Sequence, residues 1–289
     1  MHGLQSRFEF RLGACHVNHG LSSNAEEWQS FCHRVCNDMR VPLDIVPIDI
    51  PRGSAEGLEA AARARRYAAF GGLSADWIVL AQHRGDQAET LLFNLLRGSG
   101  LGGVAAMSET RELRSGLGLM RPLLGVARSE IDAYLMKHGL EWVEDESNQD
   151  TGFSRNFLRH KVIPLLQSRF PAAEKKLATA SRHFSEAQAL LDELALLDLG
   201  DRPPLFPLPV SCLSRLPEPR ARNLLRFLLA RHGIRIPSGE RLLEFVRQLL
   251  EAKPDRHPAA VFGNMQVRRQ RGKVYLEPLA KEAGRSQDV

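Results

Sequence analysis

Between residues 11 and 97, short apolar runs alternate with longer segments of helical periodicity, and this alternation restricts the fold more than any other feature. The apolar runs cover residues 11–18, 43–50 and 77–81, and each is followed by a segment with apolar residues every three or four positions. Strands that alternate with helices in this way pair in parallel through right-handed crossovers. The pattern therefore predicts an α/β fold built on a mostly parallel sheet.

The stretch from His83 to Gly103 directly follows the third apolar run. Asp86 and Glu89 are three residues apart, so both lie on one face of the first turn of the helix, next to His83. In open α/β sheets, ligands bind where the strands end. Two interpretations remain open: the acids stabilise the helix start through its dipole or a capping box, or they form a ligand site. An apolar stripe that would pack on the sheet follows at Ala88, Leu91, Leu92 and Leu95.

A glycine-rich tail, Gly98 to Gly103, closes this stretch. Glycine permits tight backbone conformations that other residues rarely adopt. The tail is typical of a loop whose backbone approaches an anion, or of the C-cap of the preceding helix.

Two earlier segments carry polar side chains that are candidates for ligand binding: one at the end of a predicted strand and one on a predicted helix. The first apolar run ends in His16-Val-Asn-His-Gly-Leu21, a turn with polar side chains where a nucleotide base would fit, and Asn24 is a candidate helix N-cap. The alanine-rich segment 54–72 predicts a helix with Arg63 and Arg66 near one face and Arg65 on another. Either a solvated basic helix or a phosphate-facing one fits this pattern.

The two halves of the chain differ in charge and in predicted structure. Residues 1–150 contain 15 Lys and Arg against 20 Asp and Glu, whereas residues 151–289 contain 24 against 14. The second half reads as three helices from Pro171 to residue 252, followed by short alternating strands. We therefore expect two domains, 1–150 and 151–289, and the basic second half suggests a polyanionic partner such as nucleic acid.

Nothing in the sequence indicates a membrane or a secreted protein. No apolar run approaches the roughly 20 residues that a membrane helix needs, and the first residues lack the apolar core of a signal peptide. The four cysteines form no CxxC pair. We expect a cytoplasmic protein without a membrane partner.

Several motifs occur in one order and, together, resemble one family. They are His16-Val-Asn-His-Gly-Leu21, Glu59-Ala-Ala-Ala-Arg-Ala-Arg-Arg-Tyr67, His83 with Asp86-Gln-Ala-Glu-Thr90, Arg97-Gly-Ser-Gly100, Arg121-Pro-Leu-Leu124, Trp142-Val-Glu-Asp-Glu-Ser-Asn148 with Asp150, and Arg155-Asn-x-x-Arg159. This series resembles the tRNA(Ile)-lysidine synthetase family, which belongs to the N-type ATP pyrophosphatases. The resemblance covers about residues 10–280.

The resemblance implies a doubly wound nucleotide-binding domain followed by a smaller, mostly helical domain that contacts tRNA. It also implies an ATP-dependent ligase. Such enzymes adenylate C2 of the wobble cytidine in the CAU anticodon of an isoleucine tRNA, and the ε-amine of free lysine then displaces AMP. ATP and Mg²⁺ would be the cofactors, and tRNA and L-lysine the partners.

Individual roles follow from the same resemblance. Asp86 and Glu89 would hold the lysine, one of them acting as base, and His83 would assist at the ATP or cytidine end. Arg155, Asn156 and Arg159 would contact tRNA. The ATP-binding residues would be Asn18, His19, Gly20, Arg63, Arg65, Arg97, Gly98, Ser99 and Gly100.

The sequence departs from the family pattern at two places. The family's Ser-Gly-Gly-x-Asp-Ser phosphate loop is absent; by the family layout, it and the first strand of the sheet would lie before residue 10. Gly85 also stands where the family usually has an acid. Three hypotheses remain open: an active lysidine synthetase whose true start lies upstream of Met1, a truncated tRNA-binding remnant that does not bind ATP, and a tRNA cytidine thiolase of the same superfamily. An in-frame phosphate loop upstream of Met1 in the gene would separate the first two.

Overall fold

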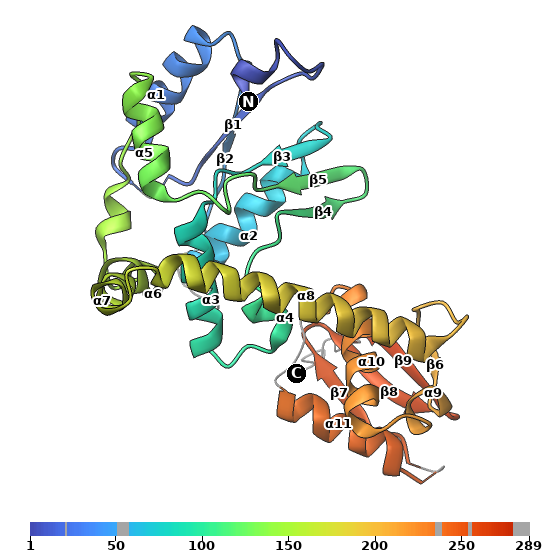
Figure 1. Cartoon of the computed structure of the whole chain (residues 1–289). Helices are drawn as coiled ribbons and strands as arrows, with labels where there is room; N and C mark the ends of the chain where they lie inside the picture. Colours follow the sequence, from blue (N-terminus) through green and yellow to red (C-terminus); the bar gives the residue numbers. More distant parts are fainter. Residues whose placement is uncertain (21, 51–57, 235–238, 254–255, 280–289) are drawn as a thin grey trace, which may run out of the picture. The chain divides into compact units, whose positions relative to one another are not determined.

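The structure, a computed structural model, describes residues 1–20, 22–50, 58–234, 239–253 and 256–279 (Figure 1). Leu21 and the predicted helix start at 54–57 lie outside these residues. The chain forms two compact units. Unit 1 comprises Met1–Glu89 and Ser108–Glu174, and unit 2 comprises Thr90–Met107 and Lys175–Val289.

Unit 1 contains the parallel strand pairing that the alternating pattern predicted. Strand β1 (Ala14–Asn18) pairs in parallel with β2 (Leu43–Pro47), and helix α1 (Ala25–Asp38) connects them. Asn24 is the N-cap residue of this helix, as predicted, although its side chain makes no capping hydrogen bond. Helix α2 (Leu58–Gly71) follows β2.

The second parallel pair positions the start of helix α3 (Arg84–Leu96). Strand β3 (Trp77–Val79) pairs in parallel with β5 (Leu117–Met120), and β4 (Thr110–Arg114) adds to β5 in antiparallel fashion. In the described residues, this three-stranded sheet and the β1–β2 pair are separate sheets. The α/β class with parallel pairing is therefore confirmed.

Close packing between β3 and β5 depends on a glycine. The Trp77 ring lies over Gly118, its register partner, and a Cβ at Gly118 would be 2.4 Å from the ring. Ile78 and Leu117 are buried beside these residues, with Phe70 from α2. A side chain at position 118 would force Trp77 away and disturb the strand that leads into α3.

Helix α3 buries part of its predicted apolar stripe. Ala88 and Leu91 are buried, whereas Leu95 is exposed, so the stripe covers only the first turns of the helix. The short helix α4 (Leu101–Val104) follows.

The rest of unit 1 leads to one long, interrupted helix. Helix α5 (Arg128–Lys137) and the 3₁₀ turn η2 (Glu146–Gln149) come first. The final segments run on continuously: α6 (Ser154–Phe157), the π-helical turn η3 (Leu158–Val162) and α7 (Ile163–Arg169). Single π turns inside helices are frequent at functional sites.

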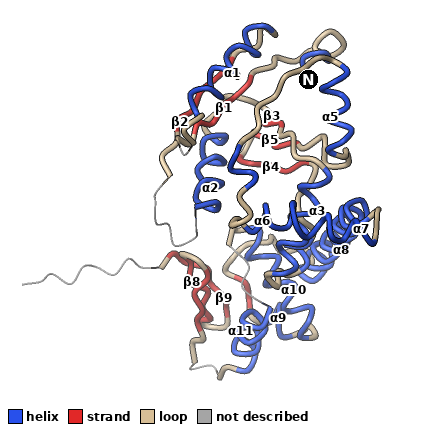
Figure 2. Tube along the Cα trace, turned by 90° about the vertical axis from the view of Figure 1, so that its left-hand side faces the viewer, coloured by secondary structure: helices blue, strands red, loops and turns tan. Residues whose placement is uncertain are grey.

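Unit 2 matches the predicted series of helices followed by short strands (Figure 2). Its helices are α8 (Ala173–Leu199), which begins in unit 1, α9 (Ser211–Ser214), α10 (Glu218–Arg231) and α11 (Gly239–Glu251). Strands β6 (Leu208–Pro209), β7 (Ala259–Phe262), β8 (Met265–Gln270) and β9 (Lys273–Pro278) form one antiparallel sheet in the order β6-β9-β8-β7. Leu224 and Leu228 of α10 share one buried core with Val267 and Val274 of the sheet. Among the described residues, no helix has the length and apolar character needed to cross a membrane.

Candidate active site

Two hydrogen bonds hold the start of α3, one between the His83 backbone and Asp86 and one between the Gly85 backbone and the His83 ring. The backbone N–H of His83 donates to Oδ2 of Asp86 at 2.9 Å, and the backbone N–H of Gly85 donates to Nδ1 of His83 at 3.0 Å. This is the geometry of a capping box, with His83 at the N-cap and Asp86 three residues later. The helix-start interpretation is therefore correct for Asp86, and its second oxygen remains available for another interaction.

Gly85 allows the His83 ring to fold back over the helix start. A Cβ at Gly85 would lie 2.9 Å from Cε1 of His83. An acid at this position, as is usual in the resembling family, would displace the ring. The glycine is thus part of the same local arrangement that positions Asp86.

Arg159 joins the two acids of α3 from the other end of unit 1. Its Nε donates to Oε1 of Glu89 at 2.6 Å, and its Nη2 donates to Oε2 of Glu89 and to Oδ1 of Asp86, both at 2.9 Å. Arg159 lies in the π-helical turn η3. Both oxygens of Glu89 are therefore occupied by a single guanidinium.

The Asp86 and Glu89 side chains differ in how deeply they are buried. The Glu89 side chain is 4% exposed, whereas that of Asp86 is 21% exposed. Burial raises the pKa of the Glu89 carboxyl above its ordinary value, and the hydrogen bonds and charge of Arg159 offset part of that rise. Glu89 is the deeply held partner of Arg159, and Asp86 is the carboxylate nearer to solvent.

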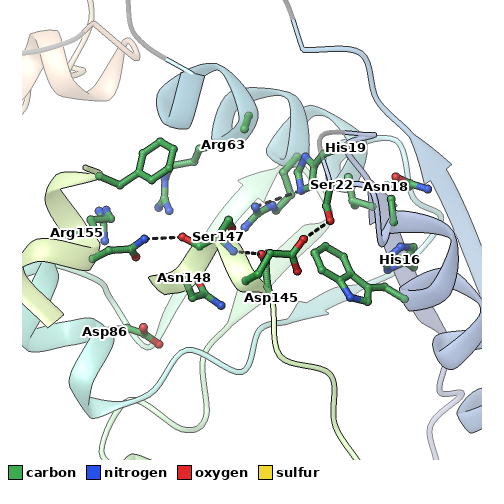
Figure 3. A pocket seen from close by; sticks show the side chains of 18 of the residues that line it. His16, Asn18, His19, Ser22, Arg63, Asp86, Asp145, Ser147, Asn148 and Arg155 are labelled. Atoms are coloured by element: carbon green, nitrogen blue, oxygen red, sulfur yellow. Dashed lines mark hydrogen bonds between the residues drawn. The ribbon is translucent and has the colours of Figure 1, made fainter. Parts of the chain in front are cut away.

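A cavity of about 720 Å³ in unit 1 contains both acids, and its size is typical of sites for small ligands. In Figure 3, Asp86 and Arg155 lie at one end, and His16 and Asn18 lie at the other. The charged lining residues are Asp86, Glu89, Asp145, Glu146, Arg63, Arg66, Arg155 and Arg159. Equal numbers of acidic and basic side chains suit a ligand set that includes both an anion and an ammonium group.

At the β1 end, His19 presents an unused hydrogen-bond donor. Nη2 of Arg66 lies 3.3 Å from Nε2 of His19. A guanidinium can only donate, so Nε2 accepts and the proton of the neutral ring lies on Nδ1. Nδ1 is buried and has no hydrogen-bond partner among the described residues. Burial, and then the charge of Arg66, lowers the pKa of His19, which keeps the ring neutral.

The acidic loop 145–150 lines the middle of the cavity and is fastened on both sides (Figure 3). The Ser22 hydroxyl donates to Oε1 of Glu146 at 2.6 Å. Nδ2 of Asn156 donates to the carbonyl oxygens of Ser147 at 2.8 Å and Asp150 at 2.9 Å. Asn156 and Arg159 thus connect one helical segment to the loop and to α3.

The structure brings together most of the predicted site residues, although they are distant in sequence. Those that line the cavity are Asn18, His19, Gly20, Arg63, Asp86, Glu89, Arg155, Asn156 and Arg159. His83 is not among the lining residues and instead contacts Asp86. Arg65 is exposed and does not line the cavity, because it faces another side of α2; Arg66 does line it, as the helical spacing with Arg63 indicated.

The predicted nucleotide loop at Arg97 to Gly100 belongs to unit 2 and serves as a helix cap. Gly98 has a φ of +67° and its N–H donates to the carbonyl of Leu95, while the N–H of Ser99 donates to the carbonyl of Asn94. These two bonds form a Schellman motif, which is a common helix end. Of the two interpretations of this tail, the C-cap is the one that the structure shows. Arg97, Gly98, Ser99 and Gly100 are not among the lining residues of the cavity.

Sequence reasoning missed several lining residues. Trp28, Gln82 and Asp145 were not predicted; Trp28 lies on α1, whereas Gln82 and Asp145 lie outside the helices and strands. For Asp145 a signal existed, since the acidic, turn-prone segment 144–152 is typical of an exposed, substrate-facing loop. Among the described residues, no group of three or more His, Cys, Asp or Glu side chains is arranged to hold a metal ion.

Comparison with known proteins places this cavity in a known fold. A model of the PP-loop domain matches residues 1–166, which include every lining residue. The chain belongs to the PP-loop domain family. A second model, the TilS substrate binding domain, matches residues 208–275 in unit 2.

The names of curated relatives agree with the family that the ordered motifs resemble. The chain is 44% identical to the tRNA(Ile)-lysidine synthase of Nitrosomonas europaea over 272 residues, which are 93% of this chain and 59% of the relative. It is 46% identical to the enzyme of the same name from Azoarcus sp. over 278 residues, 95% of this chain and 61% of the relative. The chain thus spans about 60% of the length of these curated relatives.

A solved structure supports the fold. The U34-tRNA thiolase NcsA from Methanococcus maripaludis superposes with a TM-score of 0.54 at 12% identity, covering 63% of this chain and 64% of that one. At this identity the similarity concerns the fold alone.

Proposed function

We propose that this chain acts as a tRNA(Ile)-lysidine synthase, joining lysine to the wobble cytidine of a CAU-anticodon isoleucine tRNA at the expense of ATP. One observation carries the proposal: a single cavity collects the polar end of β1, the arginines of α2, the acids of α3 and the Arg155–Arg159 segment. These are the motifs by which the sequence resembles the lysidine synthetase family, and relatives named tRNA(Ile)-lysidine synthase are 44% and 46% identical to this chain. The thiolase shares only the fold.

The β1 end of the cavity suits the nucleotide. The unpaired Nδ1–H of His19 needs an acceptor such as a base nitrogen or a phosphate oxygen. Arg63 and Arg66 add positive charge for the phosphates. Mg²⁺ would neutralise the triphosphate, and its usual site combines phosphate oxygens with one or two carboxylates; Asp145, which lines the cavity, is able to supply one.

The α3 end suits the amine of lysine. The cluster of Asp86, Glu89 and Arg159 carries net negative charge that suits an ammonium group, which must lose a proton before its nitrogen attacks C2 of the cytidine. The reaction then proceeds in two steps: adenylation of the cytidine with release of pyrophosphate, and displacement of AMP by the lysine amine. Positioning and charge neutralisation are the main protein contributions to such phosphoryl-type transfers.

Contacts with tRNA are assigned to Arg155, near the cavity, and to the basic second half of the chain. Phosphate contacts by Lys and Arg make binding salt-dependent. Arg159 holds the acids of α3 and Asn156 holds the loop at Ser147 and Asp150, so we assign both residues first to the architecture of the site.

Incorporation of labelled lysine tests the proposal. The purified chain is incubated with ATP, L-lysine and the CAU-anticodon tRNA, and pyrophosphate release is measured in parallel. We expect incorporation of lysine to require all three substrates, pyrophosphate release to require ATP and the tRNA, and Asp86→Asn to abolish incorporation. Asp132→Asn, an exposed acid of α5, is the matched control and should retain activity.

The competing hypothesis, a tRNA-binding remnant, predicts a different result. In that case the chain retains tRNA in a filter-binding assay but neither binds ATP nor incorporates lysine. That result would replace the enzyme by the remnant.

A further inference from the structure

The two acids of α3 are not equivalent. Glu89 has both oxygens bonded to Arg159 and a side chain that is 4% exposed. Asp86 accepts one bond on each oxygen, from Arg159 and from the backbone of His83, and is 21% exposed. A carboxylate oxygen has about two acceptor positions, so Asp86 retains free acceptor capacity. Each oxygen of Glu89 likewise accepts one bond, so exposure distinguishes the two acids, and Asp86 is the more exposed one.

Charge leads to the same distinction. Arg159 neutralises one of the two negative charges, so the three side chains together carry one net negative charge, which a single ammonium group would balance. Two unpaired carboxylates in this position would repel each other, and burial would favour protonation of one of them. With Arg159 in place, the remaining charge is available at Asp86.

On the basis of the proposed function, we propose that Arg159 is a positioning residue. It holds Glu89 as an internal counter-ion, so that Asp86 alone receives the ε-ammonium group of the lysine substrate. Arg159 and Asn156 lie on the helix that is interrupted by the π turn η3. Asn156 fastens the loop 147–150, and Arg159 fastens α3. The Arg155-Asn-x-x-Arg159 motif thus builds the amino-acid end of the cavity in addition to any contact with tRNA.

A charge-rescue experiment tests this assignment through binding of L-lysine, measured by calorimetry on the full chain. Glu89→Leu leaves Arg159 without its main partner, and its charge then competes with the ammonium for Asp86. We expect roughly tenfold weaker binding. The double variant Glu89→Leu with Arg159→Met removes both charges, and an apolar pair of similar volume replaces a buried ion pair without large loss of stability. Binding of lysine should return to near the wild-type affinity, whereas Asp86→Asn should abolish it.

Controls separate this role from a general structural one. The matched pair is Arg128 and Asp132 on α5, which form an exposed ion pair at 2.8 Å; Arg128→Met with Asp132→Leu should leave lysine binding unchanged. L-norleucine, which keeps the α-ammonium group but lacks the ε-ammonium group of lysine, should bind weakly to every variant. If the Leu/Met double variant melts at a much lower temperature, Glu89→Gln with Arg159→Gln provides the same neutral pair.

The outcomes distinguish the inference from the proposed function. In one outcome, the wild type binds lysine but the folded double variant binds it as weakly as Glu89→Leu does. This result would show that Glu89 contacts the substrate, and it would overturn the inference but not the proposed function. Wild type that binds no lysine would overturn both the role of Asp86 and the proposed function. Recovery in the double variant supports the positioning role, since a direct ligand cannot be replaced by leucine.

Discussion

Replacement of Arg159 by methionine should destabilise unit 1 in a pH-dependent way. The guanidinium donates three hydrogen bonds to two carboxylates. Each charge-assisted bond contributes about 1.5–3 kcal/mol, but the sum overstates the loss, because Arg159 is 35% exposed and solvent screens part of it. Glu89 is also able to take up a proton. We expect a loss of about 3 kcal/mol near pH 8 and about 1 kcal/mol near pH 5.

The sign of the pH dependence follows from the raised pKa of Glu89. A carboxyl whose pKa is higher in the folded chain contributes its stability below the unfolded pKa and loses it as the pH rises through the folded pKa. Arg159→Met removes interactions that lower this pKa, so the folded pKa of Glu89 rises further. The penalty of the substitution must therefore grow from acid to neutral pH.

Urea denaturation of wild type and Arg159→Met at several pH values measures this penalty. Arg128→Met, in the exposed pair with Asp132, is the control and should cost less than about 0.5 kcal/mol at every pH. A penalty for Arg159→Met that is independent of pH, or that shrinks as the pH rises, would refute the argument that Glu89 is buried and held ionised by Arg159.

Three further changes have expected outcomes. Gly85→Asp, which restores the acid usual in the family, should displace the His83 ring and lower the melting temperature; an unchanged ring environment by NMR would contradict this. Arg121→Met should cost about 3 kcal/mol in urea denaturation, because Arg121 is 3% exposed and donates to Gln82, to the carbonyl of Ser108 and to Tyr67; a loss below about 1 kcal/mol would count against it. Arg155→Ala should weaken tRNA binding more at low salt than at high salt, and equal binding at both would remove Arg155 from the interface.

The local pattern of the sequence was enough to predict most elements. The alternation of apolar runs and helical segments predicted the parallel pairing of β1 with β2. Helices α8, α10 and α11 and the final strands also lie where their periodicity indicated. These features depend on neighbouring residues, so a short window of sequence contains the necessary information.

The ordered motifs also identified most residues of the cavity, including Asn18, Arg63 and the acids of α3. For some residues, however, the sequence did not distinguish a role in ligand binding from a local role at a helix end. Gly98 satisfies the end of α3, and Asp86 completes a capping box with His83. Such local roles are visible only when the hydrogen-bond partner of each group is known.

What the sequence determined by itself is the set of elements and the chemical kinds of residue at their ends. What only the tertiary structure decided is which charges meet. Arg159 is 70 residues from Glu89 in the chain, and no periodicity or spacing relates them. Burial and folding bring the guanidinium onto the carboxylates, and since an ion pair depends on distance and dielectric surroundings, the division of roles between Asp86 and Glu89 exists only in the folded chain.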